Sequence, residues 1–385
     1  MAQAELLWVP TGRQFTFDDL VHWQGKRTGD AFEDIAARID VIVLGPHASA
    51  AFPGELREFV SAELTCRKQH DFSDVITGDV GRTWADLDPR TVFIEAPHSR
   101  VALDGNRAPQ EDIEPALREF FKRLQKQRAG EDVSFVGCDE VRPITFAGED
   151  VLIEPTQDQE WRQLLEAIRA AARLGVECYR ASVERVISAV RVKRRESRRG
   201  GRQPPMIVGL HDTCSWKMRK DGAIVVERPE PDRMPKLVNF GNGGDHRGDH
   251  VGLEGSEEPT PRLASGERIR QIAAAWCTAF GYACDASFAH PAANACDEIV
   301  SFNRPFKGGA EVKQWGLRVQ YDPDFEMACD IFQVEFDRDA LLGPDVAGQL
   351  KLPGSDWPAV DQAHVLKVAS NLKAAHDALY SGIHP

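Results

Sequence analysis

The sequence predicts a three-layer α/β/α fold in which a central mixed sheet is covered by helices on both faces. Continuous short apolar runs, rather than polar–apolar alternation, are typical of strands buried on both sides of a sheet. Five such runs occur along the chain, at residues 40–45, 91–96, 133–137, 206–210 and 331–336. Segments with helical spacing of apolar residues lie among and after these runs, and this succession favours a layered α/β domain.

Three segments are expected to be helices. Residues 163–190 carry apolar side chains at mostly helical spacing. Residues 267–282 follow Ser265, a residue type that caps helix N-termini. Residues 358–380 are expected to form a closing amphipathic helix.

One domain is expected over residues 1–385, with its core at about 40–345 and two insertions. The first insertion, 191–205 (RVKRRESRRGGRQPP), is expected to be an exposed basic connection, with anion or partner binding as the alternative. The second, 216–235, is expected to be a hairpin or flap, because Asp221-Gly222 favours a tight turn.

Composition limits the classes of partner. The chain is 42% hydrophobic and 28% charged, as globular proteins are, and its formal net charge is -13. An acidic surface repels phosphate backbones, so nucleic-acid binding is not expected. No run reaches the roughly 20 apolar residues that span a bilayer, and residues 1–8 contain no basic leader. A cytoplasmic protein without membrane association is therefore expected. Its eight cysteines form no CxxC pair and are expected to be buried thiols.

Two histidines follow apolar runs directly. His47 comes after the run 40–45, and His211 comes after the run 206–210, while Glu335 lies near the end of a third run. Ligands gather at the carboxyl ends of strands in open α/β sheets. Catalytic zinc takes nitrogen and oxygen ligands and keeps one position for a water nucleophile. The pattern indicates a metal hydrolase, although a single histidine after a strand is more often structural.

The order of motifs from residue 40 to about 345 resembles that of the N-formylglutamate amidohydrolase family. The last two motifs are the most specific, because each fixes several residue types at set spacing. The matching stretches are Pro46-His47-Ala48-Ser49, Asp79, Arg100 with Asp104-Gly105-Asn106-Arg107, His211-Asp212, the glycine-rich 239–249, Asn303-Arg304-Pro305-Phe306-Lys307-Gly308-Gly309 and Gln333-Val334-Glu335-Phe336-Asp337-Arg338.

The resemblance implies a phosphorylase/hydrolase-like (zinc exopeptidase-like) fold and a site for Zn²⁺ or another divalent metal. His47, Asp79 and His211 are implied as the metal ligands, and Glu335 as the general base and acid. The alternative for Glu335 is a salt bridge with Arg338 alone.

Further residues are implied around the substrate. Asn106 and Arg107 resemble a pair that holds a substrate carboxylate, for which a guanidinium is well suited. Among the remaining candidates, the resemblance implies Arg100 and Arg338 as catalytic residues. Arg100 and Arg304 are also candidates for binding a carboxylate or an oxyanion, and Gly308 and Gly309 would allow close backbone approach to a ligand.

The expected function is metal-dependent hydrolysis of the amide of an N-acyl, N-formyl-like amino acid, in amino-acid metabolism. Ser49 stands where the family has glycine and Asp212 where it has serine, so the substrate stays open. Asp212 could also be an added ligand or a partner of one. The alternatives are a zinc carboxypeptidase-like exopeptidase acting on short peptides, and a non-catalytic binding protein that retains the fold. The sequence predicts no particular oligomeric state.

Two competing constellations are weaker. Asp245, His246, Asp249 and His250 form a D-H-x-x-D-H cluster that could bind a metal by itself. Cys214 lies three residues after His211 and could be a nucleophile, but one cysteine near one histidine in sequence is more often a buried thiol.

Overall fold

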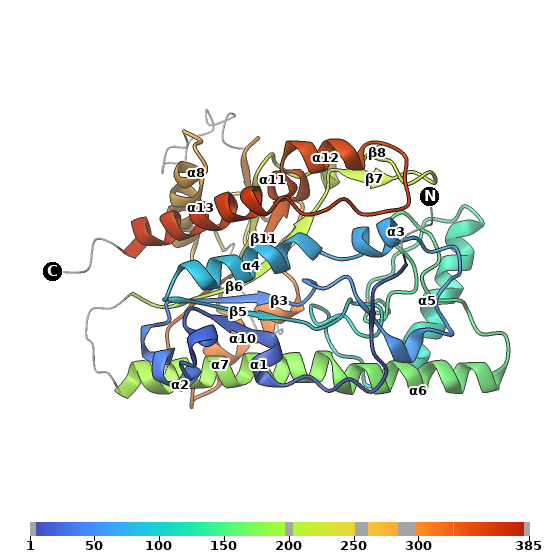
Figure 1. The fold of residues 1–385 in the computed structure, drawn as a ribbon, viewed down its shortest axis with the longest axis horizontal. Helices are drawn as coiled ribbons and strands as arrows, with labels where there is room; N and C mark the ends of the chain where they lie inside the picture. The colour runs from blue at the N-terminus through green and yellow to red at the C-terminus, as the bar shows by residue number, and fades with distance from the viewer. Residues whose placement is uncertain (1–4, 197–202, 251–260, 284–297, 326, 381–385) are drawn as a thin grey trace.

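A seven-stranded mixed sheet lies at the centre of the part of the chain that the structure describes (Figure 1). This structure is a computed structural model, and it describes residues 5–196, 203–250, 261–283, 298–325 and 327–380. The strand order is β10-β9-β11-β6-β3-β5-β2. β11, β6, β3 and β5 are parallel to their neighbours in that series, whereas β9 runs antiparallel to β11 and β2 antiparallel to β5. The bounds are β2 Val21–Trp23, β3 Val41–Gly45, β5 Thr91–Glu95, β6 Met206–Thr213, β9 Val238–Gly241, β10 Val300–Phe302 and β11 Asp330–Asp337.

Helices cover both faces of the sheet (Figure 1). One face packs against α4 Val75–Leu87, α8 Gly266–Ala279, α11 Arg338–Leu342, α12 Pro344–Leu350 and α13 Gln362–Tyr380. The other packs against α1 Phe17–Leu20, α2 Phe32–Ile35, α7 Val176–Glu196 and α10 Ala310–Tyr321. A third apolar cluster joins α5 Ile113–Arg128 and α6 Asp158–Leu174 beyond the strand ends. The remaining elements are α3 Cys66–Asp71, β1 Trp8–Val9, β4 Phe52–Pro53, β7 Trp216–Met218, β8 Ile224–Glu227 and four short 3₁₀ turns at 26–28, 36–38, 54–56 and 230–232.

The predicted three-layer α/β class with a mixed central sheet is confirmed. Four of the five apolar runs are the strands β3, β5, β6 and β11. The strand predicted at 133–137 is wrong. There Val136 is 80% exposed and Gly137 has a φ of +83°, while Phe135 stacks on Phe120 and the Arg123 guanidinium binds two carbonyl oxygens. The segment is therefore held by side chains, not by a sheet.

The predicted helices are present with adjusted bounds. The stretch 163–190 contains two helices, α6 and α7, separated at Gly175, where a Cβ atom would lie 1.7 Å from His98 Nε2. Ser265 caps α8 as expected, accepting a hydrogen bond from the N–H of Arg268 at 3.2 Å. The closing helix α13 begins at 362 instead of 358.

The two expected insertions have different outcomes. The hairpin is confirmed, because β7 and β8 pair antiparallel around Asp221-Gly222. In the basic segment, 191–196 belong to α7, and 197–202 lie outside the described residues.

Along β6 and β11, apolar side chains point to one face of the sheet and polar side chains of the site point to the other. Val208 and Leu210 face the α4 side together with Phe332, Val334 and Phe336. Side chains of neighbouring positions in a strand point to opposite faces, so His211, Gln333 and Glu335 share the α10 side. His211 and Glu335 are direct neighbours in the parallel register. A polar site is therefore built at the carboxyl ends of the two central strands.

A buried hydrogen bond between Asp88 and His376 joins α13 to the turn before β5 and yields a stability prediction. The fully buried Asp88 accepts hydrogen bonds from His376 Nδ1 at 2.5 Å and from Arg90 N–H at 3.0 Å. Burial alone would raise its pKa, but these partners lower the pKa of Asp88 to about 2. A depressed carboxyl pKa contributes stability above pH 4, about 2 kcal/mol, that disappears as the pH falls through 2.

Asp88→Asn is expected to lower the free energy of unfolding by about 2 kcal/mol at pH 7 and by much less at pH 2.5. Urea denaturation at the two pH values measures this difference. Asp377→Asn is the control, because Asp377 is half exposed and pairs with Arg90 and Lys373 at the surface, where a change below 1 kcal/mol is expected. An equal loss at both pH values would contradict the charge-based account.

Candidate metal centre

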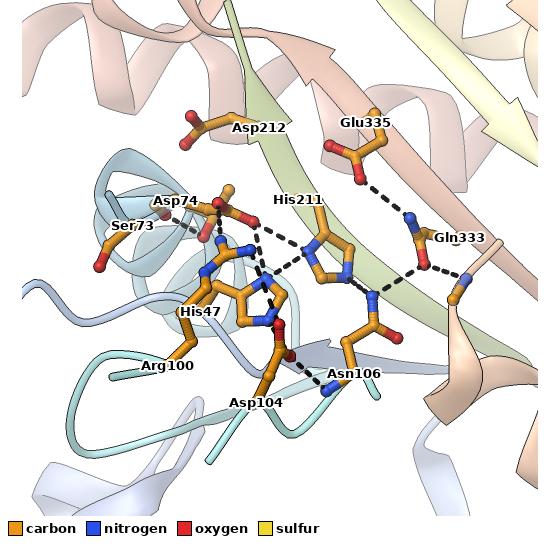
Figure 2. Close-up of polar contacts among 12 residues, drawn as sticks. His47, Ser73, Asp74, Arg100, Asp104, Asn106, His211, Asp212, Gln333 and Glu335 are labelled. Carbon is orange, nitrogen blue, oxygen red and sulfur yellow. Dashed lines mark hydrogen bonds and ion pairs between the residues drawn. The ribbon is translucent and has the colours of Figure 1, made fainter. Parts of the chain in front are cut away.

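Three buried ligand atoms converge at the carboxyl ends of the central strands (Figure 2). His47 lies in the loop directly after β3, Asp74 directly precedes α4, and His211 belongs to β6. His47 Nδ1 lies 3.1 Å from His211 Nδ1. Asp74 Oδ2 lies 3.2 Å from the first nitrogen and 2.8 Å from the second. Within the described chain, these residues form the group of His, Cys, Asp and Glu side chains that can share one ion.

Asp74 is fixed by the loop that carries His47 and by an arginine. Its N–H donates to the carbonyl oxygen of His47 at 3.0 Å, and its Oδ1 accepts from Arg100 Nη2 at 2.5 Å. Burial would raise its pKa, but Arg100 and His47 hold the pKa of Asp74 well below its usual range. The carboxylate is therefore ionised, with Oδ2 left to face the histidines.

Asp104 sets the tautomer of His47. Its Oδ1 lies 2.6 Å from His47 Nε2 and also accepts the N–H of Asn106 at 2.8 Å. Burial would raise the pKa of Asp104, but His47 keeps this pKa far below its ordinary value. The Asp104 carboxylate is therefore the acceptor of the hydrogen bond, and Nε2–H of His47 is the donor. In the neutral imidazole, Nδ1 of His47 is then the unprotonated nitrogen and can act as a ligand. Metal-binding histidines usually make such a bond to a carboxylate through their second nitrogen.

The geometry and chemistry of the three residues fit a divalent metal. The ligand atoms are 2.8–3.2 Å apart, close to the roughly 3.3 Å that separates the ligands of tetrahedral zinc at its usual bond lengths. Two imidazole nitrogens and one carboxylate oxygen are also a donor set that zinc prefers.

The expectation for Asp79 needs correction, because the structure does not bring it to the histidines. Asp79 lies inside α4, where its carboxylate pairs with Arg82 at 2.9 Å and lines a separate cavity with Glu95. Asp74 occupies the expected place five residues earlier. The motif itself, an acidic residue ahead of a helix, could have found Asp74, since Asp74 is the N-cap residue of α4.

Glu335 lies beside the three ligands at a cavity of about 230 Å³. Its Oε1 accepts a hydrogen bond from Gln333 Nε2 at 2.9 Å. Gln333 Oε1 in turn accepts from the N–H of Gly309 at 2.7 Å and from Asn106 Nδ2 at 3.2 Å, so its amide orientation is fixed (Figure 2). Burial, with the charge of Asp74, raises the pKa of Glu335 well above its usual value. A carboxyl group whose pKa is raised toward the working pH of an enzyme is suited both to accept and to donate a proton.

The predicted substrate-binding residues Asn106, Arg107, Gly308 and Gly309 all line this cavity. Arg107 Nε donates to Asp139 at 2.7 Å. Burial would lower the pKa of Arg107, but the negative charges of Asp104 and Asp139 outweigh this effect and raise it. Gly309 is required where it stands, since an added Cβ would lie 2.1 Å from Asn106 Oδ1.

The three other predicted arginines differ in their positions. Arg100 reaches the site through Asp74. Arg338 lines the cavity and binds Asp212, Asp71 and the carbonyl oxygen of Ser73, so it holds the turn that precedes Asp74. Arg338 thus pairs with Asp212 and Asp71 and not with Glu335, which accepts a hydrogen bond from Gln333.

Arg304 requires a correction. Its side chain is 63% exposed, pairs with Glu230 at 3.0 Å and does not line the cavity. Asp212 also differs from the expectation of an added ligand, since alternation along β6 turns its side chain away from His211 (Figure 2). Its carboxylate accepts from Arg338 Nε instead.

Neither competing constellation assembles a site in the described structure. Asp245 Oδ1 accepts the N–H groups of Arg247 and Asp249 in a tight turn, and Asp249 pairs with Arg270. Burial raises the pKa of the Cys214 thiol to about 12, which makes it a poor nucleophile.

Some cavity residues were missed by sequence reasoning. Thr213 is the last residue of β6, Arg228 directly follows β8, and Phe146 comes from a loop between α5 and α6. None of them lies in an apolar run or a recognised motif, so the sequence carried no signal for them.

Asp104→Asn is expected to weaken zinc binding about 10- to 100-fold, because the amide no longer fixes the His47 tautomer. Competition with a chromogenic chelator measures the affinity. Asp139→Asn is the matched control, since Asp139 pairs with Arg107 and does not touch either histidine. Unchanged affinity in Asp104→Asn would show that His47 needs no such partner.

Comparison with known proteins agrees with the motifs. The model of the N-formylglutamate amidohydrolase family matches residues 39–171. No curated protein matches the chain. A solved structure, the N-formylglutamate amidohydrolase from Ralstonia eutropha JMP134, is 12% identical with a TM-score of 0.48, over 94% of this chain and 97% of that one. In the described part of the chain, no helix has the length and apolar character needed to cross a membrane.

The matched segment contains His47, Asp74, Asp104 and the Asn106-Arg107 pair. The resemblance to the N-formylglutamate amidohydrolase family is thereby confirmed over residues 39–171.

Proposed function

We propose that this protein is a metal-dependent amidohydrolase that cleaves the amide of an N-acyl amino acid, with formyl or a similarly small group as the acyl part. The observation that carries the proposal is the convergence of His47 Nδ1, Asp74 Oδ2 and His211 Nδ1 at a cavity that also exposes Glu335. The family match over 39–171 supports the reaction class.

His47, Asp74 and His211 would hold the metal, Zn²⁺ or another divalent cation. When bound there, such an ion supplies Lewis acidity and lowers the pKa of water. The fit of the donor set supports this assignment, and Asp79 is replaced by Asp74 as the carboxylate ligand.

Glu335 moves the protons of the reaction. As a base it takes one proton from the attacking water, which adds to the amide carbon. As an acid it then gives that proton to the nitrogen as the carbon–nitrogen bond breaks, so that a carboxylic acid and a free amine leave. Gln333, anchored by the N–H of Gly309, holds Glu335 in place for both transfers.

Arg107 and Asn106 orient the substrate by its α-carboxylate. Arg107 presents a guanidinium at the cavity wall, kept in place by Asp139. Fixing one end of the substrate places the amide beside the reacting groups, which lowers the entropic part of the barrier. Arg100 and Arg338 act on the ligands instead, by holding Asp74 and the turn before it.

Removal of the metal tests the proposal. Full-length protein loaded with Zn²⁺ is expected to release amine and formate from N-formyl amino acids. A chelator should reduce the rate at least about 100-fold, and added Zn²⁺ should restore it. Free amine is measured with a fluorogenic reagent, with dipeptides assayed in parallel. Hydrolysis of dipeptides alone would favour an exopeptidase, and stoichiometric metal without turnover of either class would favour a binding protein.

A further inference from the structure

Arg228 is an arginine of the cavity without a carboxylate partner in the described structure. It follows β8 in the hairpin and lines the cavity next to Thr213. Among the described residues, the side-chain hydrogen bond that it makes runs from Nη2 to Thr213 Oγ1, at 3.3 Å. Its Nε is buried and has no hydrogen-bond partner. A buried N–H group without an acceptor is costly, so a ligand that supplies one is favoured.

The other arginines of the cavity are paired with carboxylates. Arg100 binds Asp74, Arg107 binds Asp139 at 2.7 Å, and Arg338 binds Asp71 at 2.7 Å as well as Asp212. Their charges are thus largely compensated within the protein. Arg228 makes no such pair among the described residues, and burial together with the repulsion of Arg338 lowers the pKa of Arg228 despite the attraction of Asp71 and Asp232.

The surroundings of Arg228 add to the local positive charge. Phe146 lines the cavity with Arg228, and the guanidinium of Arg142 lies 4.6 Å from the centre of its ring. Arg142 Nε is also buried without a partner. In a chain of net charge -13, this concentration of cations draws an anionic group to one part of the cavity.

We propose that Arg228 determines substrate specificity by binding a second carboxylate of the substrate, one carried on the amino-acid side chain. This inference rests on the proposed function, in which Arg107 and Asn106 bind the α-carboxylate. Nε–H and an adjacent Nη–H of one guanidinium match the two oxygens of a carboxylate. The hairpin 216–235 thereby contributes a specificity residue to a site whose metal ligands come from other segments.

The test compares two substrates that differ in one charge, N-formylglutamate and N-formylglutamine. Arg228→Gln is expected to reduce kcat/KM for N-formylglutamate about 100-fold, mainly through KM, and to change that for N-formylglutamine less than about threefold. Arg219→Gln is the matched control, because Arg219 lies in the same hairpin and pairs with Asp221 at the surface. Arg228→Lys should recover part of the preference for the charged substrate, since it keeps the charge without the planar fork.

Calorimetric binding of the free amino acids separates this inference from the proposed function. Arg228→Gln should weaken binding of L-glutamate and leave that of L-glutamine unchanged in the same full-length proteins. If the wild type hydrolyses neither substrate while this difference in binding persists, the proposed function fails and the role of Arg228 stands. Equal effects on the charged and neutral compounds, or no effect on either, would overturn the role of Arg228 and leave the proposed function intact.

Discussion

Glu335→Gln is expected to bind zinc as the wild type does and to lose about 10²- to 10⁴-fold in kcat. Glutamine has the same shape, and its side-chain oxygen can still accept the hydrogen bond from Gln333 Nε2. It cannot take up and return a proton, so the step that needs a base and then an acid is lost. Metal content by atomic emission and turnover by amine release are measured on the same preparation.

Asp337→Asn is the control for this variant. Asp337 lies on the same strand, and burial raises its pKa to about 7. It does not line the cavity, and it contacts Ser215 and the N–H of Asp339. Activity within about threefold of the wild type is expected for Asp337→Asn. Retained turnover in Glu335→Gln, or an equal loss in both variants, would remove Glu335 from the proton transfers.

Asp74→Asn is expected to weaken zinc binding more than about 100-fold and to abolish turnover at micromolar zinc. The change removes the negative charge that compensates the metal, and it leaves the guanidinium of Arg100 facing a neutral amide. Zinc affinity by chelator competition and turnover over a range of zinc concentrations are the measurements. A far-ultraviolet spectrum and a melting curve show whether the variant is folded.

Asp79→Asn is the decisive comparison, because the sequence motif pointed to Asp79 as the ligand. Its carboxylate pairs with Arg82 on α4, away from the histidines. The variant is expected to keep its zinc affinity and activity within about threefold. Loss of zinc by Asp79→Asn together with retention by Asp74→Asn would contradict the ligand set proposed above.

The sequence predicted those parts of the molecule whose residue pattern has one physical explanation. Runs such as 206–210 can only be buried, so they became the central strands, and the histidines directly after or within those strands came together. The run 133–137 failed because a few apolar residues can also pack through one aromatic ring, here Phe135 on Phe120. The strands β2, β9 and β10 were not predicted, because three or four residues are too short to show a pattern.

The site residues divide in the same way. His47, His211 and Glu335 were predictable from strand ends and motifs, and the structure brings them to one cavity. Asp79 and Arg304 were not distinguishable from Asp74 and Arg228 by residue type. Which carboxylate and which arginine reach the cavity depends on the rotation of α4 and on how the hairpin packs against β6, and these are tertiary properties.

Anomalous diffraction at the zinc absorption edge, from crystals of the full-length protein grown with Zn²⁺, locates the ion that the whole mechanism requires. One strong peak is expected within bonding distance, about 2.0–2.2 Å, of His47 Nδ1, Asp74 Oδ2 and His211 Nδ1. A peak at Asp245 and His250, a peak beside Asp79, or no peak in protein that turns over substrate would contradict the assignment.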